Sequence, residues 1–278
     1  MSHTKKLIYF GASGCGKAYC KNTGILPDFF VDNDEKKWGK FFNGVEVKNP
    51  SILTSTNIKK LVITTSFLES VYPQILSLGV CKNLIEIPPK SMWSDRVFEE
   101  KETRVQAAKE LNKIMEDFNK VFEGKNSLVA VGGTALGFMR DKDFIHWDDD
   151  IDLFAPIFTR SKLIEMLKNY EYFFEEKHES IMQAIVFFMP LLNGKKIPVS
   201  VDFFDNTKSS FKDTFEDYSW NWPTTMFSNC LKVEIHGKKM NIPNPASEYL
   251  EKVYGLEWFK PNPEFSYGDY AGNKKLNK

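Results

Sequence analysis

The first third of the chain alternates short apolar runs with stretches of helical periodicity. Apolar runs bounded by turn residues are typical of buried strands, and strands that alternate with helices predict a parallel sheet with crossover helices. The predicted strands are KLIYF (6–10), DFFVD (28–32), KLVITT (60–65) and a short one at 83–87, and the predicted helices begin near Gly14 and span 66–78.

The pair Pro88-Pro89 interrupts this alternation, and the pattern changes after it. Apolar residues recur at three- and four-residue spacings over 96–122, which predicts one long amphipathic helix. We expect an α/β domain over residues 1–90 and an α+β domain over residues 91–278, and a length of 278 residues agrees with two domains. The later predicted elements are a strand at 127–131 that ends in a Gly132-Gly133 turn, a helix at about 160–170, and strands within 181–192 and at 197–204.

Charge and hydropathy exclude several classes of protein. Lys plus Arg and Asp plus Glu both number 37, so the chain lacks the basic excess of proteins that bind nucleic acid through its phosphates. The longest apolar stretch, 184–192, contains Pro190 and is shorter than the roughly 20 residues that cross a bilayer. There is no signal-peptide pattern, and the four cysteines have neither metal-ligand nor disulfide spacing, so we expect a cytoplasmic protein.

The acidic segment WDDDIDL carries the strongest candidate chemistry. If its second half is a strand, Asp150 and Asp152 project from one face, about 7 Å apart, while Ile151 and Leu153 enter the core. Paired carboxylates suit Mg²⁺, with Mn²⁺ as an alternative, whereas zinc prefers His and Cys. The competing interpretation is a solvated acidic loop after a tight turn.

A third carboxylate lies on a second predicted strand, IPVSVDFF, where Asp202 faces away from the apolar side. With Asp150 and Asp152 it would complete a site for two metal ions. The glycines of the Gly132-Gly133 pair would let backbone N–H groups approach a phosphate closely. Arg140 offers a planar set of donors to the same phosphate.

This segment resembles the LicD-type phosphotransferase family, which includes bacterial phosphocholine transferases and the fukutin-like enzymes of eukaryotes. A tryptophan followed by three aspartates and Ile-Asp is a specific signature, and the resemblance spans about residues 96–261. The strand of Asp202 looks like the family's third acidic position, and IPNPASEYLEKVYGLEW looks like its C-terminal pattern. The positions that match around the signature are Gly133, Thr134, Leu136, Gly137, Arg140, Lys142 and residues 144–152.

The resemblance implies a nucleotidyltransferase-like fold and a Mg²⁺-dependent reaction in a bacterial cytoplasm. A substituted phosphate of the choline, glycerol or ribitol type would pass from a CDP-linked donor to a hydroxyl of a cell-surface glycan, with release of CMP. Asp150, Asp152 and Asp202 would hold the metal ions, and Asp202 would also accept the proton of the acceptor hydroxyl. The residues expected to contact the donor are Gly132, Gly133, Thr134, Arg140, Lys142, Trp147 and Asp149.

Three residues depart from the family's pattern. His146 stands where the family often has proline, and Asp141 and Asp143 replace residues expected to be basic or glycine. Because extra negative charge at these positions would influence the choice of donor, the resemblance does not identify the head group.

Two other functions stay open, one that uses the same carboxylates and one in which the acidic site is residual. A nucleotidyltransferase would move a nucleoside monophosphate from a triphosphate to a small acceptor and release pyrophosphate. A nucleotide-sugar-binding or scaffold protein would keep its biological activity in an Asp150→Asn variant. Tryptophan faces offer a second clue, since Trp147, Trp220 and Trp222 would either surround a quaternary ammonium or simply pack in the core.

Near the N-terminus, KLIYFGASGCGKA is a strand that runs into Gly11, Gly14 and Gly16. The spacing approaches a P-loop, but Ala18 stands where Ser or Thr would bind Mg²⁺. Asp32 ends the next strand, about twenty residues on, as a ribose-binding acid does in a dinucleotide-binding domain. The segment FFVDNDEKKWGK resembles Rossmann-like N-terminal domains of bacterial glycan-modifying enzymes, which implies a nucleotide- or nucleotide-sugar-binding domain; the alternative is a packing domain without a ligand.

Overall fold

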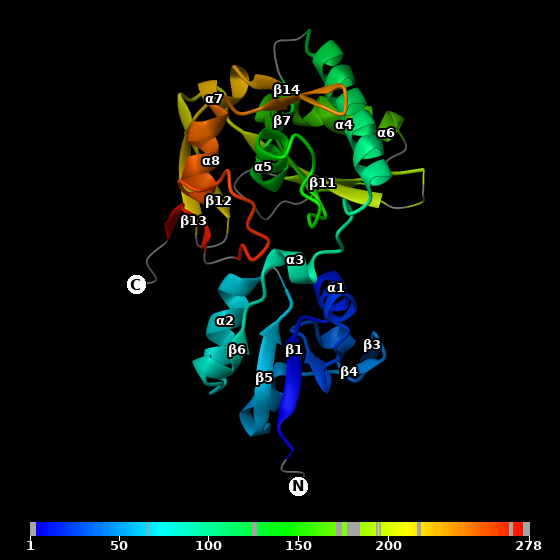
Figure 1. Ribbon diagram of the computed structural model, residues 1–278, viewed down its shortest axis with the longest axis vertical. Helices are drawn as coiled ribbons and strands as arrows, with labels where there is room; N and C mark the ends of the chain where they lie inside the picture. Colours follow the sequence, from blue (N-terminus) through cyan, green and yellow to red (C-terminus); the bar gives the residue numbers. More distant parts are fainter. Residues whose placement is uncertain are drawn as a thin grey trace. The chain divides into compact units, whose positions relative to one another are not determined.

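The computed structural model describes residues 4–65, 67–123, 127–170, 174–176, 184–192, 194, 196–215, 218–266 and 269–274. The chain divides into two compact units, Met1–Asp95 with Asn262–Asp269, and Arg96–Pro261 with Tyr270–Lys278. It therefore starts in the first unit, builds the second and returns to the first for a short segment (Figure 1). Within the described ranges no helix is both long and apolar enough to cross a membrane.

A largely parallel sheet forms the first unit (Figure 1). Its strands lie in the order β3-β4-β2-β1-β5-β6, and each neighbouring pair is parallel except β3 with β4. Ranked along the chain, the parallel strands follow the order 3-2-1-4-5 of doubly wound folds. The elements are β1 (Lys6–Phe10), α1 (Gly14–Thr23), β2 (Phe29–Val31), β3 (Phe41–Phe42), β4 (Val45–Lys48), β5 (Ile58–Ile63), α2 (Leu68–Ser77), β6 (Ile85–Glu86) and α3 (Lys90–Trp93), with 3₁₀ turns at Glu35–Lys37, Pro50–Ser55 and Lys82–Leu84.

Both faces of this sheet are buried. Ile8 and Phe10 of β1 enter one apolar core, and Tyr9 between them enters another that contains Phe30 of β2. A strand buried on both faces needs an almost continuous apolar sequence, which is the pattern that predicted these strands. The predicted β1, β2, β5 and β6 and the helix α2 are confirmed to within two residues at each end, and α1 begins at Gly14 as predicted.

The second unit contains a five-stranded mixed sheet in the order β7-β8-β11-β10-β9. β8 and β11 are parallel, with Asp152 opposite Ser200 and Phe154 opposite Asp202, whereas the other neighbours are antiparallel. The elements up to this sheet's last strand are α4 (Lys101–Val121), β7 (Val129–Ala130), α5 (Gly132–Arg140), β8 (Ile151–Pro156), a 3₁₀ turn at Ile157–Thr159, α6 (Arg160–Asn169), β9 (Phe174–Glu176), β10 (Ile185–Pro190) and β11 (Lys196–Phe204).

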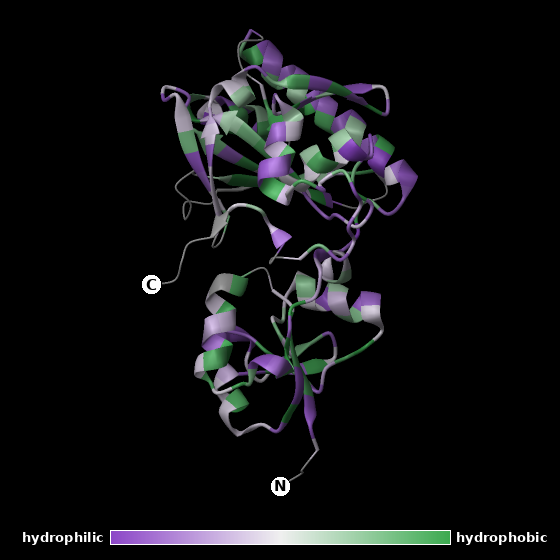
Figure 2. Ribbon diagram, turned by 60° about the vertical axis from the view of Figure 1, so that its left-hand side comes forward, coloured by the Kyte–Doolittle hydropathy of each residue, from purple (hydrophilic) through white to green (hydrophobic). Residues whose placement is uncertain are grey.

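Two helices of this unit differ from the prediction. The long amphipathic helix α4 begins at Lys101 rather than Arg96, because Glu100 is extended, with φ −84° and ψ 133°, and Arg96 has φ 47°. Gly132 and Gly133 were predicted to form a turn after a strand, but they are the first residues of α5. Helices in both units carry purple and green residues together in Figure 2, as expected of helices with one face in a core and one in solvent.

The last third of the chain, where the sequence shows weak periodicity, forms small sheets and short helices. β12, β13 and β16 make a three-stranded sheet, and β14 and β15 make a hairpin. The elements are β12 (Ser210–Phe215), β13 (Tyr218–Pro223), α7 (Thr225–Ser228), β14 (Leu231–Ile235), β15 (Lys238–Ile242), α8 (Ala246–Tyr254) and β16 (Asn273–Lys274).

Candidate functional site

Three consecutive carboxylates, Asp148, Asp149 and Asp150, form a compact group directly before β8, which we call the acidic triad. Each offers one carboxylate oxygen, and these oxygens lie within 4.8 Å of one another. Asp148 is only 6% exposed, and the other two are half-buried. Like charges this close repel one another, and a bound cation offsets that repulsion. The acidic triad therefore supplies oxygen ligands of the kind that a divalent cation binds.

The two glycines at the start of α5 leave space for carboxylates to lie close to this end of the helix. A Cβ on Gly133 would lie 2.6 Å from Oδ2 of Asp148, and a Cβ on Gly132 would lie 3.1 Å from Oδ2 of Asp152. Gly132 also has φ 54°, in the left-handed region that favours glycine. The glycine pair thus brings the backbone at the head of α5 against the acidic residues.

Asp152 and Asp202 lie on one face of the parallel pair β8 and β11. Asp152 pairs with Ser200, and Asp202 is two residues further along the same strand, so the side chains of all three project to the same side. The predicted alternation along β11 is confirmed, because Val199 and Val201 are fully buried while Ser200 and Asp202 are only partly so. Two carboxylates from neighbouring strands therefore extend the acidic surface beyond the triad.

The predicted metal ligands were Asp150, Asp152 and Asp202, and the structure gathers a different set most tightly. Among the described residues, the acidic group within 4.8 Å consists of Asp148, Asp149 and Asp150. Asp150 belongs to both sets. The participation of Asp152 and Asp202 in metal binding stays a prediction.

Comparison with protein-family models matches residues 127–245 to a family described as LicD/FKTN/FKRP, nucleotidyltransferase domain. The match includes the glycine pair, the acidic triad and the strands β8 and β11. The chain carries a LicD-type nucleotidyltransferase domain. The resemblance predicted from the WDDDID signature is thereby confirmed, and residues 127–245 are called the LicD domain below.

Solved structures give more distant similarities. The Cid1 poly(U) polymerase is 15% identical with a TM-score of 0.28, over 36% of this chain and 31% of that one. An antigenic nucleotidyltransferase-like protein from Paracoccidioides brasiliensis is 14% identical with a TM-score of 0.29, over 49% of this chain and 61% of that one. The chain thus covers less than two thirds of either protein.

A putative myo-inositol dehydrogenase from Sinorhizobium meliloti 1021 is 10% identical with a TM-score of 0.24, over 86% of this chain and 82% of that one. Comparison with curated proteins gave no match.

The structure gives the hydrogen bonds or the burial of four residues that are expected to contact a donor. The Thr134 hydroxyl accepts a hydrogen bond from the N–H of Asp152 at 3.0 Å, which ties α5 to β8. Arg140 donates from Nε and Nη2 to both carboxylate oxygens of Asp141, at 2.8 and 2.7 Å. Lys142 is exposed and Trp147 half-buried. Their contacts with a donor stay predictions.

The aspartates that depart from the family's pattern are balanced by basic groups within the chain. Asp141 is paired with Arg140, and Asp143 is paired with Arg104 at 2.8 Å and His236 at 2.8 Å. Burial raises the pKa of Asp143, but the hydrogen bonds from His236 and Arg104 outweigh this and hold the pKa below its usual value. The negative charge of these positions is thus paired with basic groups of the chain itself.

Two residues near the site were not found from the sequence. The buried hydroxyl of Tyr249 in α8 accepts a hydrogen bond from the N–H of Gly132 at 2.9 Å. Asp213 in β12 accepts one from Nε1 of Trp222 at 3.2 Å. Burial raises the pKa of Asp213 to about 6, and the charge of Asp202 raises it as well, while the Trp222 hydrogen bond lowers it.

The sequence contains a pattern that could have pointed to each of these two residues. Tyr249 lies on the buried face of α8 with Ala246, Leu250 and Val253, at the spacing of an amphipathic helix. Asp213 follows Phe211 at the two-residue spacing of one strand face, so it places a charge on a partly buried side. Trp222, considered as part of an ammonium cage, is fully buried with its ring 4.9 Å from that of Tyr249.

The three N-terminal glycines differ in how closely other atoms approach them. A Cβ on Gly11 would lie 2.5 Å from the carbonyl oxygen of Thr64, and a Cβ on Gly16 would lie 2.3 Å from the carbonyl oxygen of Gly11. Gly14 has nothing within 4 Å of its Cβ position. Gly11 and Gly16 are therefore required by close packing of β1, α1 and β5, and ligand binding by all three stays a prediction.

Asp32 has three donors within the first unit. Its Oδ2 accepts from the N–H of Ala12 at 2.8 Å and from Nζ of Lys37 at 2.9 Å, and its Oδ1 accepts from the N–H of Asp34 at 2.9 Å. These bonds connect the glycine loop to the end of β2. A ribose hydroxyl at Asp32, as predicted, would join or replace these donors.

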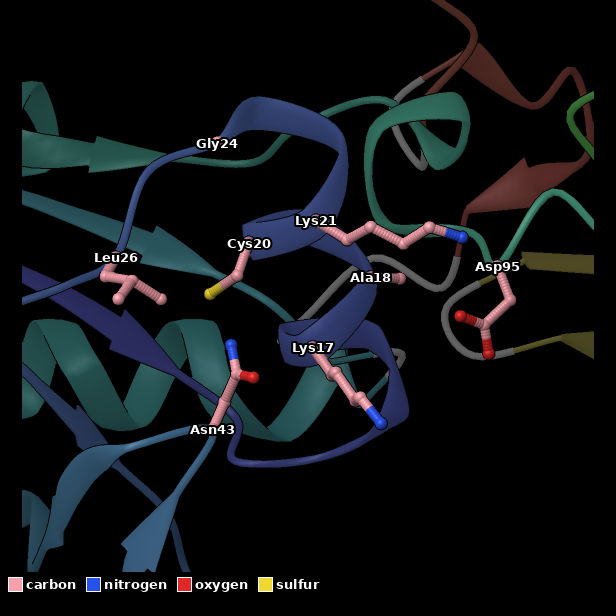
Figure 3. Close-up of a pocket in the computed structure, with 8 residues that line it drawn as sticks. All are labelled: Lys17, Ala18, Cys20, Lys21, Gly24, Leu26, Asn43 and Asp95. Carbon is pink, nitrogen blue, oxygen red and sulfur yellow. The ribbon is translucent and has the colours of Figure 1, made fainter.

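A cavity of about 500 Å³ opens beside α1 in the first unit (Figure 3). Lys17 and Lys21 on α1, Asn43 and Asp95 supply its polar groups, and the predicted glycines and Asp32 do not line it. The cavity is therefore separate from the glycine loop on which the sequence prediction rests. Its remaining lining residues are Ala18, Cys20, Gly24 and Leu26.

Proposed function

We propose that the protein transfers a substituted phosphate from a CDP-linked donor to a hydroxyl of a cell-surface glycan and releases CMP. The observation that carries this proposal is the acidic triad, whose carboxylate oxygens lie within 4.8 Å of one another beside the glycine pair of a LicD domain. The donor head group is of the choline, glycerol or ribitol type. The reaction takes place in a bacterial cytoplasm.

The donor set at the site fits Mg²⁺. The candidate ligands are carboxylates, and hard oxygen ligands suit Mg²⁺ or Mn²⁺ better than zinc. Asp150 is the central ligand, the rest of the triad supports it, and Asp152 and Asp202 complete a site for two ions. When bound, Mg²⁺ would offset the negative charge of the donor's phosphates.

The chain's own groups then have separate tasks. Asp202 accepts the proton of the acceptor hydroxyl as a general base. The acceptor oxygen forms a bond to the transferred phosphorus, and the bond from that phosphorus to the CMP oxygen breaks. The backbone at the head of α5, with Gly132, Gly133 and Thr134, lies against the phosphates, and Arg140 and Lys142 offset charge on them.

A nucleotidyltransferase reaction is the main rival, because it would use the same fold and carboxylates. The two reactions differ in the product that leaves, which is CMP for phosphate-substituent transfer and pyrophosphate for nucleotidyl transfer. The product therefore distinguishes them without knowledge of the acceptor sugar.

Thermal unfolding with CDP-choline, CDP-glycerol, CDP-ribitol, ATP, UDP-GlcNAc and NAD, each with and without Mg²⁺, tests the proposal. A ligand at a hundred times its Kd stabilises a protein by about 2.7 kcal/mol, a shift of several degrees. We expect a CDP compound to raise the Tm only with Mg²⁺, and D150N to abolish that rise. Mg²⁺-dependent stabilisation by ATP alone would contradict the proposal and support the rival, and stabilisation by NAD or UDP-GlcNAc alone would move the function to the first unit.

A further inference from the structure

Asp143 lies at the centre of a charged cluster that connects three separate parts of the second unit. Its Oδ2 accepts from Nε of Arg104 in α4 at 2.8 Å, and Nε2 of His236 lies 2.8 Å from its Oδ1. An ionised carboxylate only accepts hydrogen bonds, so Nε2 of His236 carries the proton and donates it. Arg104, 7% exposed, also donates to the carbonyl oxygens of Phe98 and Glu99. We call Asp143, Arg104 and His236 the Asp143 cluster.

The segment that carries Asp143 leads directly to the acidic triad. Oδ1 of Asp143 accepts from the N–H of Phe144, whose buried ring stacks on Phe98 at 4.4 Å. The N–H of Asp148 then donates to the carbonyl oxygen of Ile145 at 3.0 Å. The Asp143 cluster thus holds one end of a short, well-packed turn whose other end is the first carboxylate of the triad.

The same segment has no room to shift toward α5. A Cβ on Gly137 would lie 2.7 Å from the carbonyl oxygen of Asp143 and 3.0 Å from the backbone nitrogen of Ile145. At its far end, Oδ2 of Asp148 lies against Gly133. The segment between Asp143 and Asp148 is therefore in close contact with α5 near both of its ends, and Asp143 is bound to Arg104 and His236 as well.

His236 occupies a turn position at which histidine is not the preferred residue. Ile235 pairs with Lys238, so His236 and Gly237 are a two-residue hairpin loop, with φ 49° and 71°. Such a loop strongly favours Asn-Gly, because both central residues need φ above zero. The histidine therefore supplies something other than turn stability, and the contact with Asp143 is what it supplies.

We propose that Asp143, held by Arg104 and His236, is the positioning residue that sets the acidic triad in place for metal binding. This inference rests on the proposed metal site. Some residues orient metal ligands through hydrogen bonds without binding the metal themselves. Mutation of such residues typically changes metal affinity by about 10–100-fold.

Mn²⁺ titration of the full chain, followed by the EPR signal of unbound Mn²⁺, tests the role with two variants. D143N removes the charge that both basic partners contact, and we expect about tenfold weaker Mn²⁺ binding. H236N provides the side chain that the turn prefers, but its amide ends nearer the backbone than the imidazole does. We expect H236N to keep or raise the Tm while it weakens Mn²⁺ binding, by less than D143N does, and loss of stability does not produce that combination.

N112A is the matched control. Nδ2 of Asn112 in α4 donates to the carbonyl oxygen of Lys239 at 2.9 Å, so it joins the same helix to the same hairpin without touching Asp143. We expect N112A to lower the Tm and leave Mn²⁺ affinity unchanged. If N112A weakens Mn²⁺ binding as much as H236N does, general loosening of the hairpin accounts for the effect and the positioning role is overturned.

D150N separates the failure of this role from the failure of the proposed function. If wild-type protein and D150N both fail to bind Mn²⁺, the proposed metal site is wrong and the positioning role falls with it. If wild-type protein binds Mn²⁺, D150N does not, and D143N and H236N match the wild type, only the positioning role is overturned.

Discussion

The hydroxyl of Tyr249 accepts a hydrogen bond from the backbone N–H of Gly132, at 2.9 Å. This bond joins α8 to the first residue of α5, where a Cβ would lie 3.1 Å from Oδ2 of Asp152. Tyr249 lies outside the matched family range of 127–245, yet it supports the glycine pair near the start of that range. The C-terminal helix is therefore part of the candidate site's structure.

Tyr249→Phe should loosen the head of α5. The ring would keep its packing on Trp222, whereas the N–H of Gly132 would lose its partner, at a cost of about 1–2 kcal/mol in the free energy of unfolding. Urea unfolding measures that change, and CMP release at saturating donor should fall with it. Tyr9→Phe, which removes a hydroxyl in the first unit that lies 3.4 Å from the carbonyl oxygen of Ile25, should leave CMP release unchanged.

Gly133→Ala should disrupt the acidic triad directly. The added methyl would lie 2.6 Å from Oδ2 of Asp148, so the carboxylate must move. We expect at least a tenfold loss of Mn²⁺ affinity, measured by the same EPR titration. Gly14→Ala, whose Cβ meets nothing within 4 Å, should bind Mn²⁺ as the wild type does. Unchanged binding in Gly133→Ala would show that Asp148 is not needed.

Asp202→Asn should alter the number of bound ions. If Asp202 completes the site for a second metal ion, the variant should bind one Mn²⁺ where the wild type binds two. Its CMP release should also be lost, because the variant lacks the general base. Isothermal titration with Mn²⁺ gives the stoichiometry. Two ions bound by the variant would remove Asp202 from the ligand set. Asp205→Asn, at a half-buried position three residues on, is the matched control.

Asp213 should give the folded protein a distinct pH dependence. Burial raises its pKa from 3.8 to about 6, so the folded state binds this proton more tightly than the unfolded chain. Its contribution to stability is present below about pH 4 and is lost as pH rises through about 6. The wild type should therefore lose stability relative to D213N over that interval, in chelator-treated protein followed by urea unfolding. A constant difference between the two proteins would show that Asp213 has an ordinary pKa.

The sequence predicts best where one physical requirement controls the pattern. In the first unit, strands buried on both faces require continuous apolar runs, and β1, β2 and β5 are found where those runs occur. Alternation along β11 likewise places Asp202 away from the core. These features depend on local spacing, which a single sequence displays in full.

Other features depend on contacts between distant segments. Gly132 and Gly133 indicate a turn, because glycine is a poor helix former. They nevertheless begin α5, where carboxylates of Asp148 and Asp152 occupy the space that a Cβ would need. Asp143 and His236 lie 93 positions apart, and nothing in the local pattern of either indicates the other. The acidic segment could therefore be singled out from the sequence, whereas the contact between Asp143 and His236 could not.

The return of residues 262–269 to the first unit affects the order in which the protein can be completed. The N–H of Lys90 donates to the carbonyl oxygen of Phe265, so the end of the first unit pairs with a segment made long after it. Because synthesis proceeds from the N-terminus, this partner emerges only after the entire LicD domain has been translated. The first unit, although its synthesis begins first, therefore stays incomplete until residues 262–269 have been translated, and its own residues up to Asp95 must wait for that segment throughout synthesis of the LicD domain.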